Sequence, residues 1–306
     1  MRKAKELLIN FIRGFCMALA DSVPGVSGGT VAFLLGFYDR FIGSLDDLFH
    51  GKGPAKVAAL SFLVKLAFGW IIGFGLSAAA LTSFFDSHIY EVSSLFMGFI
   101  VFAIPIVALE EKRVLKGRAR NLAFAVLGAA LVVAVTLLNP TAGSGMSVAV
   151  EHLDAGLAVY VFFAAMVAIT AMVLPGISGS TLLLIFGLYV PIMGAVRAVM
   201  GLDMAYLPIL LVFAAGVAAG VLVFVRLIRR CLERFRSQTV YAILGMMAGS
   251  LYSITQGPLT LAVPQPAMEL ATFSPLFFAA GGLVVGGLQL MRRQLEDPAD
   301  AGDPAP

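Results

Sequence analysis

The chain has 306 residues, of which 60% are hydrophobic and 13% are charged, and its formal net charge is +3 at pH 7. Soluble domains carry about a quarter of their residues as Asp, Glu, Lys and Arg, so this composition excludes an ordinary soluble protein. Uncharged runs such as 155–196 and 270–291 reach the roughly 20 apolar residues that a membrane-spanning helix needs. The sequence therefore predicts an all-α, polytopic integral membrane protein.

The apolar segments form two halves with the same order of elements. The first half, residues 1–140, is predicted to contain an interrupted helical hairpin at 7–42 and spans at 57–81, 93–109 and 121–138. The second half, residues 150–293, is predicted to contain an interrupted hairpin at 156–196 and spans at 206–226, 239–255 and 272–291. Residues 294–306 are expected to form a disordered cytoplasmic tail. The basic and then apolar start faintly resembles a signal peptide, but without a small-residue cleavage site it is interpreted as the first helix.

Each hairpin is interrupted by nearly the same string of residues. The string VPGVSGGT at 23–30 recurs as LPGISGST at 174–181, at a constant offset of 151 residues. The match continues to Gly36 and Tyr38, which correspond to Gly187 and Tyr189. The repeat indicates that the two halves share one structural plan.

The distribution of Lys and Arg predicts the orientation of these segments. If the N-terminus is cytoplasmic and each hairpin returns to its own side, 17 of the 21 Lys and Arg residues are cytoplasmic and only Arg197 lies in an outside loop, as the positive-inside rule requires. Both termini are then cytoplasmic, and the halves are inverted with respect to each other. Inverted-topology repeats of this kind are common in secondary transporters.

Charge does not distinguish a re-entrant hairpin from two fully spanning helices. Residues 7–20 would form a helix of about 21 Å at 1.5 Å per residue, which is shorter than a hydrocarbon core of ~30 Å. The first hairpin is therefore predicted to be re-entrant, and the second, which is longer, is left open.

The repeated strings are suited to binding an anion inside the membrane. Proline and glycine interrupt the helix, and the helix that follows begins with amide groups that have no intrahelical acceptor and carry the positive end of the helix dipole. Small residues let a phosphate or carboxylate approach those amides. The candidate binding residues in the strings are Ser22, Pro24, Gly25, Ser27, Gly28, Gly29, Thr30, Pro175, Gly176, Ser178, Gly179, Ser180 and Thr181. The alternative is that both strings are tight turns whose hydroxyl groups only cap the next helix.

Five ionisable residues in or near the apolar segments are further candidates. Asp21, whose counterpart in the second string is Met172, is predicted to carry a proton or to pair with an arginine, because a carboxylate at membrane depth is costly. Arg13 lies two turns earlier and is a partner for Asp21 or for a substrate phosphate. Lys65 either faces a cavity or extends to the interface. Arg40 and Arg197 are placed either as interfacial anchors or as contacts for a lipid headgroup.

The paired strings resemble those of a bacterial family of polyprenyl-phosphate transporters, which translocate undecaprenyl phosphate. The resemblance covers about residues 8–292. The matching motif positions are Asp21, Pro24, Gly25, Ser27, Gly28, Gly29, Thr30, Pro175, Gly176, Ser178, Gly179 and Thr181. It implies that the protein returns the lipid carrier of cell-envelope synthesis across the bacterial inner membrane, with membrane lipid as its surroundings. Asp21 itself, as an acid at membrane depth, makes protons a candidate coupling ion.

Two other functional classes are weighed against this expectation. A transporter of a small soluble anion would use the same inverted frame. A membrane lipid-phosphate enzyme would need a cluster of acid, base or nucleophilic side chains near the phosphate, and no histidine lies near either string. The two cysteines, Cys16 and Cys231, provide neither a disulfide framework nor a metal cluster. No enzyme activity, cofactor, metal or nucleic-acid partner is therefore expected.

Overall fold

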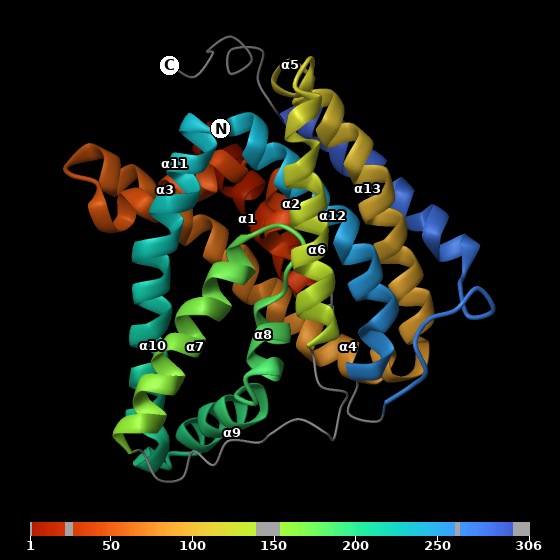
Figure 1. Ribbon diagram of the computed structural model, residues 1–306. Helices are drawn as coiled ribbons and strands as arrows, with labels where there is room; N and C mark the ends of the chain where they lie inside the picture. The colour runs from red at the N-terminus through yellow and green to blue at the C-terminus, as the bar shows by residue number, and fades with distance from the viewer. Residues whose placement is uncertain (1, 22–26, 139–153, 261–263, 296–306) are drawn as a thin grey trace.

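The computed structural model describes residues 2–21, 27–138, 154–260 and 264–295. Within these ranges every regular element is a helix, which confirms the predicted all-α fold class (Figure 1). The candidate binding residues Ser22, Pro24 and Gly25, and the predicted tail from residue 296 onward, lie outside the described residues.

The helices follow one another in two runs separated by residues 139–153. The first run consists of α1 (Arg2–Asp21), α2 (Gly28–Leu34), α3 (Tyr38–His50), α4 (Pro54–Glu110), α5 (Lys112–Leu115), η1 (Ala119–Asn121) and α6 (Leu122–Leu137). The second run consists of α7 (Ala155–Val173), α8 (Gly179–Ile185), α9 (Tyr189–Met200), η2 (Met204–Tyr206), α10 (Leu207–Gly220), η3 (Val221–Val225), α11 (Arg226–Arg234), α12 (Arg236–Gln256), η4 (Gly257–Thr260) and α13 (Pro275–Leu295).

Five helical segments of the described chain are long and apolar enough to cross a membrane. They are Pro54–Leu76, His88–Glu110, Ala119–Leu137, Ala155–Val173 and Met204–Arg234. Their outward faces are apolar: along the first half of α4, Val57, Leu60, Val64, Phe68 and Ile71 are each about half exposed or more. A continuous exposed apolar stripe at helical spacing is the surface that lipid covers in a membrane protein. The protein is therefore a multi-pass membrane protein.

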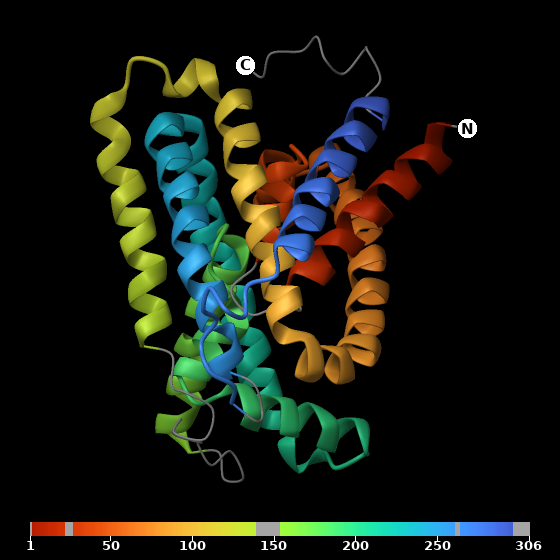
Figure 2. The same ribbon diagram turned by 90° about the vertical axis from the view of Figure 1, so that its right-hand side faces the viewer.

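The two hairpins enter the molecule from opposite ends. In Figure 1, α1 begins at the end where α3, α5 and α11 lie, and the chain returns there through α2 and α3, whereas α7 begins at the other end and returns to it through α8 and α9. Figure 2 shows that α13 also finishes near the start of α1. We call this end, which carries the basic helices α5 and α11, the basic end. The arrangement is compatible with the predicted inverted repeat.

The packing of the first long helices also repeats between the halves. A Cβ atom on Gly69 of α4 would lie 2.0 Å from the carbonyl oxygen of Phe11 in α1, and one on Gly216 of α10 would lie 2.3 Å from that of Phe162 in α7. Phe162 follows Phe11 by 151 residues and Gly216 follows Gly69 by 147. In each half, a glycine therefore lets one helix of the hairpin and the next span touch backbone to backbone.

In each half, the first span after the hairpin is separated from the next helix by a bend at an equivalent residue. His88 interrupts α4 with φ −131° and ψ 32°, and Phe235 separates α11 from α12 with φ −126° and ψ 38°. They are again 147 residues apart. The segment 82–92, which separates the predicted spans 57–81 and 93–109 and was therefore expected to be a loop, is helical apart from this bend.

Both short helices after the strings end in the same motif. Gly36 has φ 70° and Gly187 has φ 66°. In the first, the N–H groups of Gly36 and Phe37 donate to Phe33 and Ala32; in the second, Gly187 and Leu188 donate to Leu184 and Leu183. This is the Schellman arrangement, in which a residue in the left-handed conformation ends the helix, and glycine adopts that conformation at the lowest cost. It explains why this glycine recurs in both copies.

Candidate functional site

The two repeated strings contact each other in the interior of the molecule. Ser27 is fully buried and has an extended backbone, and its Oγ accepts from the N–H of Gly29 at 3.0 Å, capping α2. The same hydroxyl donates to the carbonyl oxygen of Leu174 at 3.0 Å, in the second string. Ser27 therefore both caps its own helix, as the turn interpretation predicted, and joins the two hairpins.

Two further contacts hold the strings together. The N–H of Gly176 donates to Oγ1 of the buried Thr30 at 3.1 Å. A Cβ atom on Gly29 would lie 2.6 Å from the carbonyl oxygen of Val173 and 3.2 Å from the nitrogen of Pro175. The start of α2 thus lies directly on the backbone of the second string, and Gly29 has no room for a side chain.

Asp21 lies at the end of α1 and faces the start of α2. Its Oδ1 accepts from the N–H of Gly28 at 2.7 Å, and its Oδ2 accepts from Nε1 of Trp70 at 2.9 Å. The Trp70 ring stacks on Phe74 with centroids 5.0 Å apart, which fixes the donor in place. The carboxylate therefore binds a free amide at the positive end of a helix, where a negative charge is stabilised.

Trp70 is a site residue that sequence reasoning missed. It is the only tryptophan in the chain and lies inside an apolar span. A buried indole N–H usually has an acceptor, so the tryptophan itself indicates that a polar partner lies nearby. However, no spacing rule connects residues 21 and 70, because their contact depends on how α1 packs against α4.

In the second string, Ser178 does not cap the following helix as Ser27 does in the first. Gly176 has φ +88°, and a Cβ there would lie 2.6 Å from the carbonyl oxygen of Met246 in α12. Ser178 precedes α8 but makes no side-chain hydrogen bond to its amides; its Oγ instead pairs with Oγ of Ser180 at 2.7 Å. Gly179, with no side chain, packs against the backbone of α7 at Ala168. Two hydroxyl groups and the first amides of α8 therefore lie together.

The charged candidates differ in their distance from the strings. Arg13 donates to Asn10 at 3.4 Å and its guanidinium lies 4.9 Å above the Phe37 ring, just beyond the end of α2. Arg40 is exposed on α3 and covers the Phe62 ring at 4.5 Å. Both arginines are thus held by aromatic rings on the first hairpin and the neighbouring part of α4.

Lys65 and Arg197 lie toward the two opposite ends of the molecule. Lys65 forms an ion pair of 2.9 Å with Glu6, and Glu6 is about 22 Å along α1 from Asp21 at 1.5 Å per residue. Lys65 therefore ties α1 to α4 near the basic end. Arg197 lies in α9 toward the opposite end, and its side chain is outside the described part of the structure.

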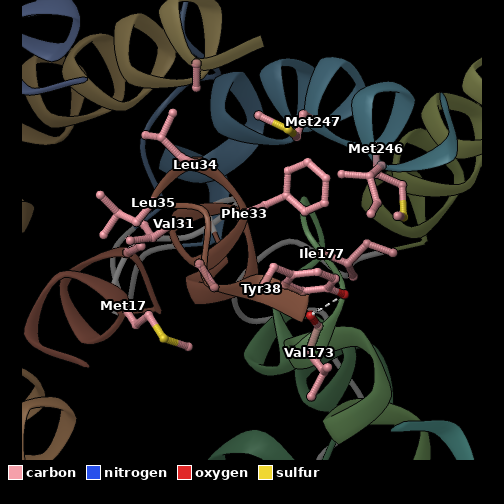
Figure 3. Packing of buried hydrophobic residues seen from close by; sticks show 14 of the residues in the cluster. Met17, Val31, Phe33, Leu34, Leu35, Tyr38, Val173, Ile177, Met246 and Met247 are labelled. Carbon is pink, nitrogen blue, oxygen red and sulfur yellow. Dashed lines mark hydrogen bonds between the residues drawn. The ribbon is translucent and has the colours of Figure 1, made fainter. Parts of the chain in front are cut away.

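A cavity of about 610 Å³ lies between the strings and the basic end. Its lining includes the buried Phe33 and Tyr38, which form the inner side, and the partly exposed Asp39, Glu111 and Arg236, which form the mouth. The buried Tyr38 ring packs edge-on against Phe33, and its hydroxyl donates to the carbonyl oxygen of Val173 at 3.3 Å (Figure 3). Tyr38 thus separates the cavity from the second string.

Comparison with known proteins identifies the family. Residues 17–271 match the family described as undecaprenyl phosphate translocase-like. The chain is 31% identical over 264 residues to a protein of Vibrio cholerae named polyprenyl-phosphate transporter, covering 82% of this chain and 79% of that protein. It is 32% identical over 249 residues to one of the same name from Staphylococcus aureus, covering 81% and 86% of the two chains. No solved structure matches. The chain belongs to the undecaprenyl phosphate translocase-like family.

Proposed function

We propose that this protein moves undecaprenyl phosphate, or a related polyprenyl phosphate, across the bacterial cytoplasmic membrane, with the phosphate bound where the two strings meet. The family and the names of the two relatives support this substrate. The main support for this binding site is the contact between the strings, in which Ser27 hydrogen-bonds to Leu174 and Thr30 to Gly176. A polar centre built from both halves therefore lies in the interior, where Ser27, Thr30, Ser178 and Thr181 are all buried.

The second string provides the more available donors for the phosphate. The hydroxyls of Ser27 and Thr30 already hold the hairpins together. Ser178 and Ser180 bond to each other, and that pair exchanges readily for bonds to a phosphate oxygen. Thr181 follows in the first turn of α8. The phosphate crosses through this polar centre while the prenyl tail stays in lipid beside the exposed apolar faces.

Asp21 is the proposed coupling residue. When it is ionised it accepts from Gly28 and Trp70 at once. A proton on the carboxyl group removes the negative charge and one of its accepting positions, which loosens the start of α2. Proton binding and the position of the first string are linked in this way, so protons are a suitable coupling ion.

The proposed orientation of the protein in the cytoplasmic membrane is based on the distribution of its basic residues. The basic end carries α5 and α11, and the positive-inside rule places such an end in the cytoplasm. The family and both named relatives are described as transporters, so a transporter is proposed here rather than an enzyme.

The substrate is tested by the lipids that accompany the purified protein. Mass spectrometry of protein extracted in mild detergent should find polyprenyl phosphate at a higher ratio to bulk phospholipid than the membrane contains. Thermal unfolding should shift upward with added polyprenyl phosphate and not with inorganic phosphate. A shift with inorganic phosphate alone would instead identify a transporter of a small soluble anion.

A further inference from the structure

Two arginines of the second half bind helix α3 of the first half at the basic end. Arg236 forms a 2.8 Å ion pair with Asp39 of α3, and it also binds both carboxylate oxygens of Glu111 at the end of α4, at 2.5 and 3.1 Å. A guanidinium group that binds both oxygens of one carboxylate forms two parallel charge-assisted hydrogen bonds, which also fix its orientation. Hydrogen bonds to Glu111, together with Asp39, raise the pKa of Arg236 above its ordinary value, so it stays a cation.

Arg229 makes the second link. From α11 its Nη1 binds Asp46 at 2.9 Å and Asp47 at 2.7 Å, both on α3, and its Nε binds Glu233 at 2.9 Å. Asp39 and Asp46 are seven residues apart, two turns along α3. Helix α3 is thus held to the second half at both of these turns. We name these contacts of Arg229 and Arg236 with α3 and Glu111 the α3 latch.

The latch is connected to the repeated strings through Tyr38. Tyr38 is the residue before Asp39 and lines the inner side of the 610 Å³ cavity, while Asp39 and Arg236 lie at its mouth. The Tyr38 hydroxyl holds Val173, directly before the second string. Figure 3 shows Tyr38 lying beside Phe33, with Ile177 of the second string close by. Any outward movement of α3 therefore draws Tyr38 away from Val173 and extends the cavity toward Ile177.

The latch has no equivalent in the other half of the sequence. At the offset of 151 residues, Asp39 corresponds to Val190, and at the offset of 147, Arg236 corresponds to Ile89. The two halves share the repeated strings, but among the described residues these ion pairs lie at the basic end. Because these ion pairs lie on one side, the free energy needed to open the protein toward that side differs from the free energy needed to open it toward the other side.

We propose that the α3 latch is a gate, which closes the route from the basic end through the cavity to the paired strings. Opening it gives the phosphate headgroup a path to that side of the membrane. A phosphate in the cavity competes with Asp39 and Glu111 for Arg236, since guanidinium binds phosphate in the same two-pronged way, so the ligand itself helps to open the gate. The identity of the ligand rests on the proposed function, whereas the gate does not.

The gate is tested by the accessibility of a cysteine behind it. The background carries Cys16→Ala and Cys231→Ala, and Ile177→Cys is added as the reporter. A charged thiol reagent that cannot cross the bilayer is applied to vesicles with the basic end outward. Arg236→Gln should increase the labelling rate about fivefold, which corresponds to ~1 kcal/mol, the upper value for a partly exposed ion pair. Asp39→Asn should act in the same direction.

Arg234→Gln is the matched control. Arg234 is an exposed arginine two residues before Arg236, and its substitution should leave the labelling rate unchanged. Equal labelling rates in the parent, Arg236→Gln and Asp39→Asn proteins would overturn the gate, and so would an equal increase with Arg234→Gln. The assay contains no polyprenyl phosphate, so a failure of the proposed substrate would not alter its outcome.

Discussion

Gly29 shows how one residue determines the contact between the hairpins. A string of small residues predicted close approach of some partner, and the repeat predicted that the two strings belong to one site. That the first string contacts the backbone at the start of the second string, at Pro175 and at Val173 directly before it, could not be predicted. It depends on the relative depth of the two hairpins, which no local pattern encodes. For the same reason Trp70 was not associated with Asp21.

Replacing Gly29 with alanine should separate the strings. The new Cβ would lie 2.6 Å from the carbonyl oxygen of Val173, and overpacking of a tight interior costs about 1–3 kcal/mol. We expect a lower unfolding temperature in detergent and loss of transport. Gly43→Ala in α3 is the control, because a Cβ there meets nothing within 4 Å. A Gly29→Ala protein as stable and active as Gly43→Ala would contradict the contact.

Neutralising Asp21 should remove the response to protons. Asp21→Asn keeps an acceptor for Gly28 but loses the charge, so transport should become slower and independent of a pH gradient across the vesicle membrane. Glu6→Gln is the control, because it neutralises an acid on the same helix at its other end. If Asp21→Asn retained the same dependence on the pH gradient as the parent, Asp21 would not be the coupling residue.

At the scale of elements, the sequence contains more of the repeat than the strings alone reveal. The strings are 151 residues apart, but Gly69 and Gly216, and the bends at His88 and Phe235, are 147 apart. The difference in offset hides these matches from a comparison in one register. Apolar composition predicted the helical class, whereas the helical bend in place of the expected loop at 82–92 depends on a single residue's backbone angles.

The two strings should respond differently to loss of a serine hydroxyl. Ser27→Ala leaves the buried carbonyl of Leu174 and the amide of Gly29 without this partner, which costs about 1–3 kcal/mol, so stability and transport should both fall. Ser180→Ala removes only the bond to Ser178, so transport should fall while the unfolding temperature stays near that of the parent. Unfolding curves and transport rates on the same preparations check both. Equal losses of stability would contradict the assignment of the phosphate to the second string.

At the scale of the whole molecule, the charge pattern predicts the orientation in the membrane. The basic helices α5 and α11 gather at one end, where α1 begins and α13 finishes (Figure 2). The distribution of charge predicts that this end is cytoplasmic, because segments rich in Lys and Arg stay on the cytoplasmic side of a membrane. The ion pairs of the α3 latch could not be predicted, since they join residues 125 to 197 positions apart.

Cysteine labelling in intact cells tests this orientation. Arg118→Cys, exposed between α5 and η1, should react with an impermeant reagent only after the cells are opened. Met204→Cys, which replaces a side chain that is 53% exposed, should react in intact cells because it lies in η2, between α9 and α10, at the opposite end (Figure 1). The reverse pattern would place the basic end outside.

The most direct measurement is the movement of labelled polyprenyl phosphate between the leaflets of vesicles that contain the purified protein. The parent protein should move the lipid much faster than vesicles without protein, Ser180→Ala should slow this movement by about tenfold, the effect of losing roughly one charge-assisted hydrogen bond, and Arg234→Gln should leave it unchanged. A rate in the parent equal to that of protein-free vesicles would contradict the proposed function.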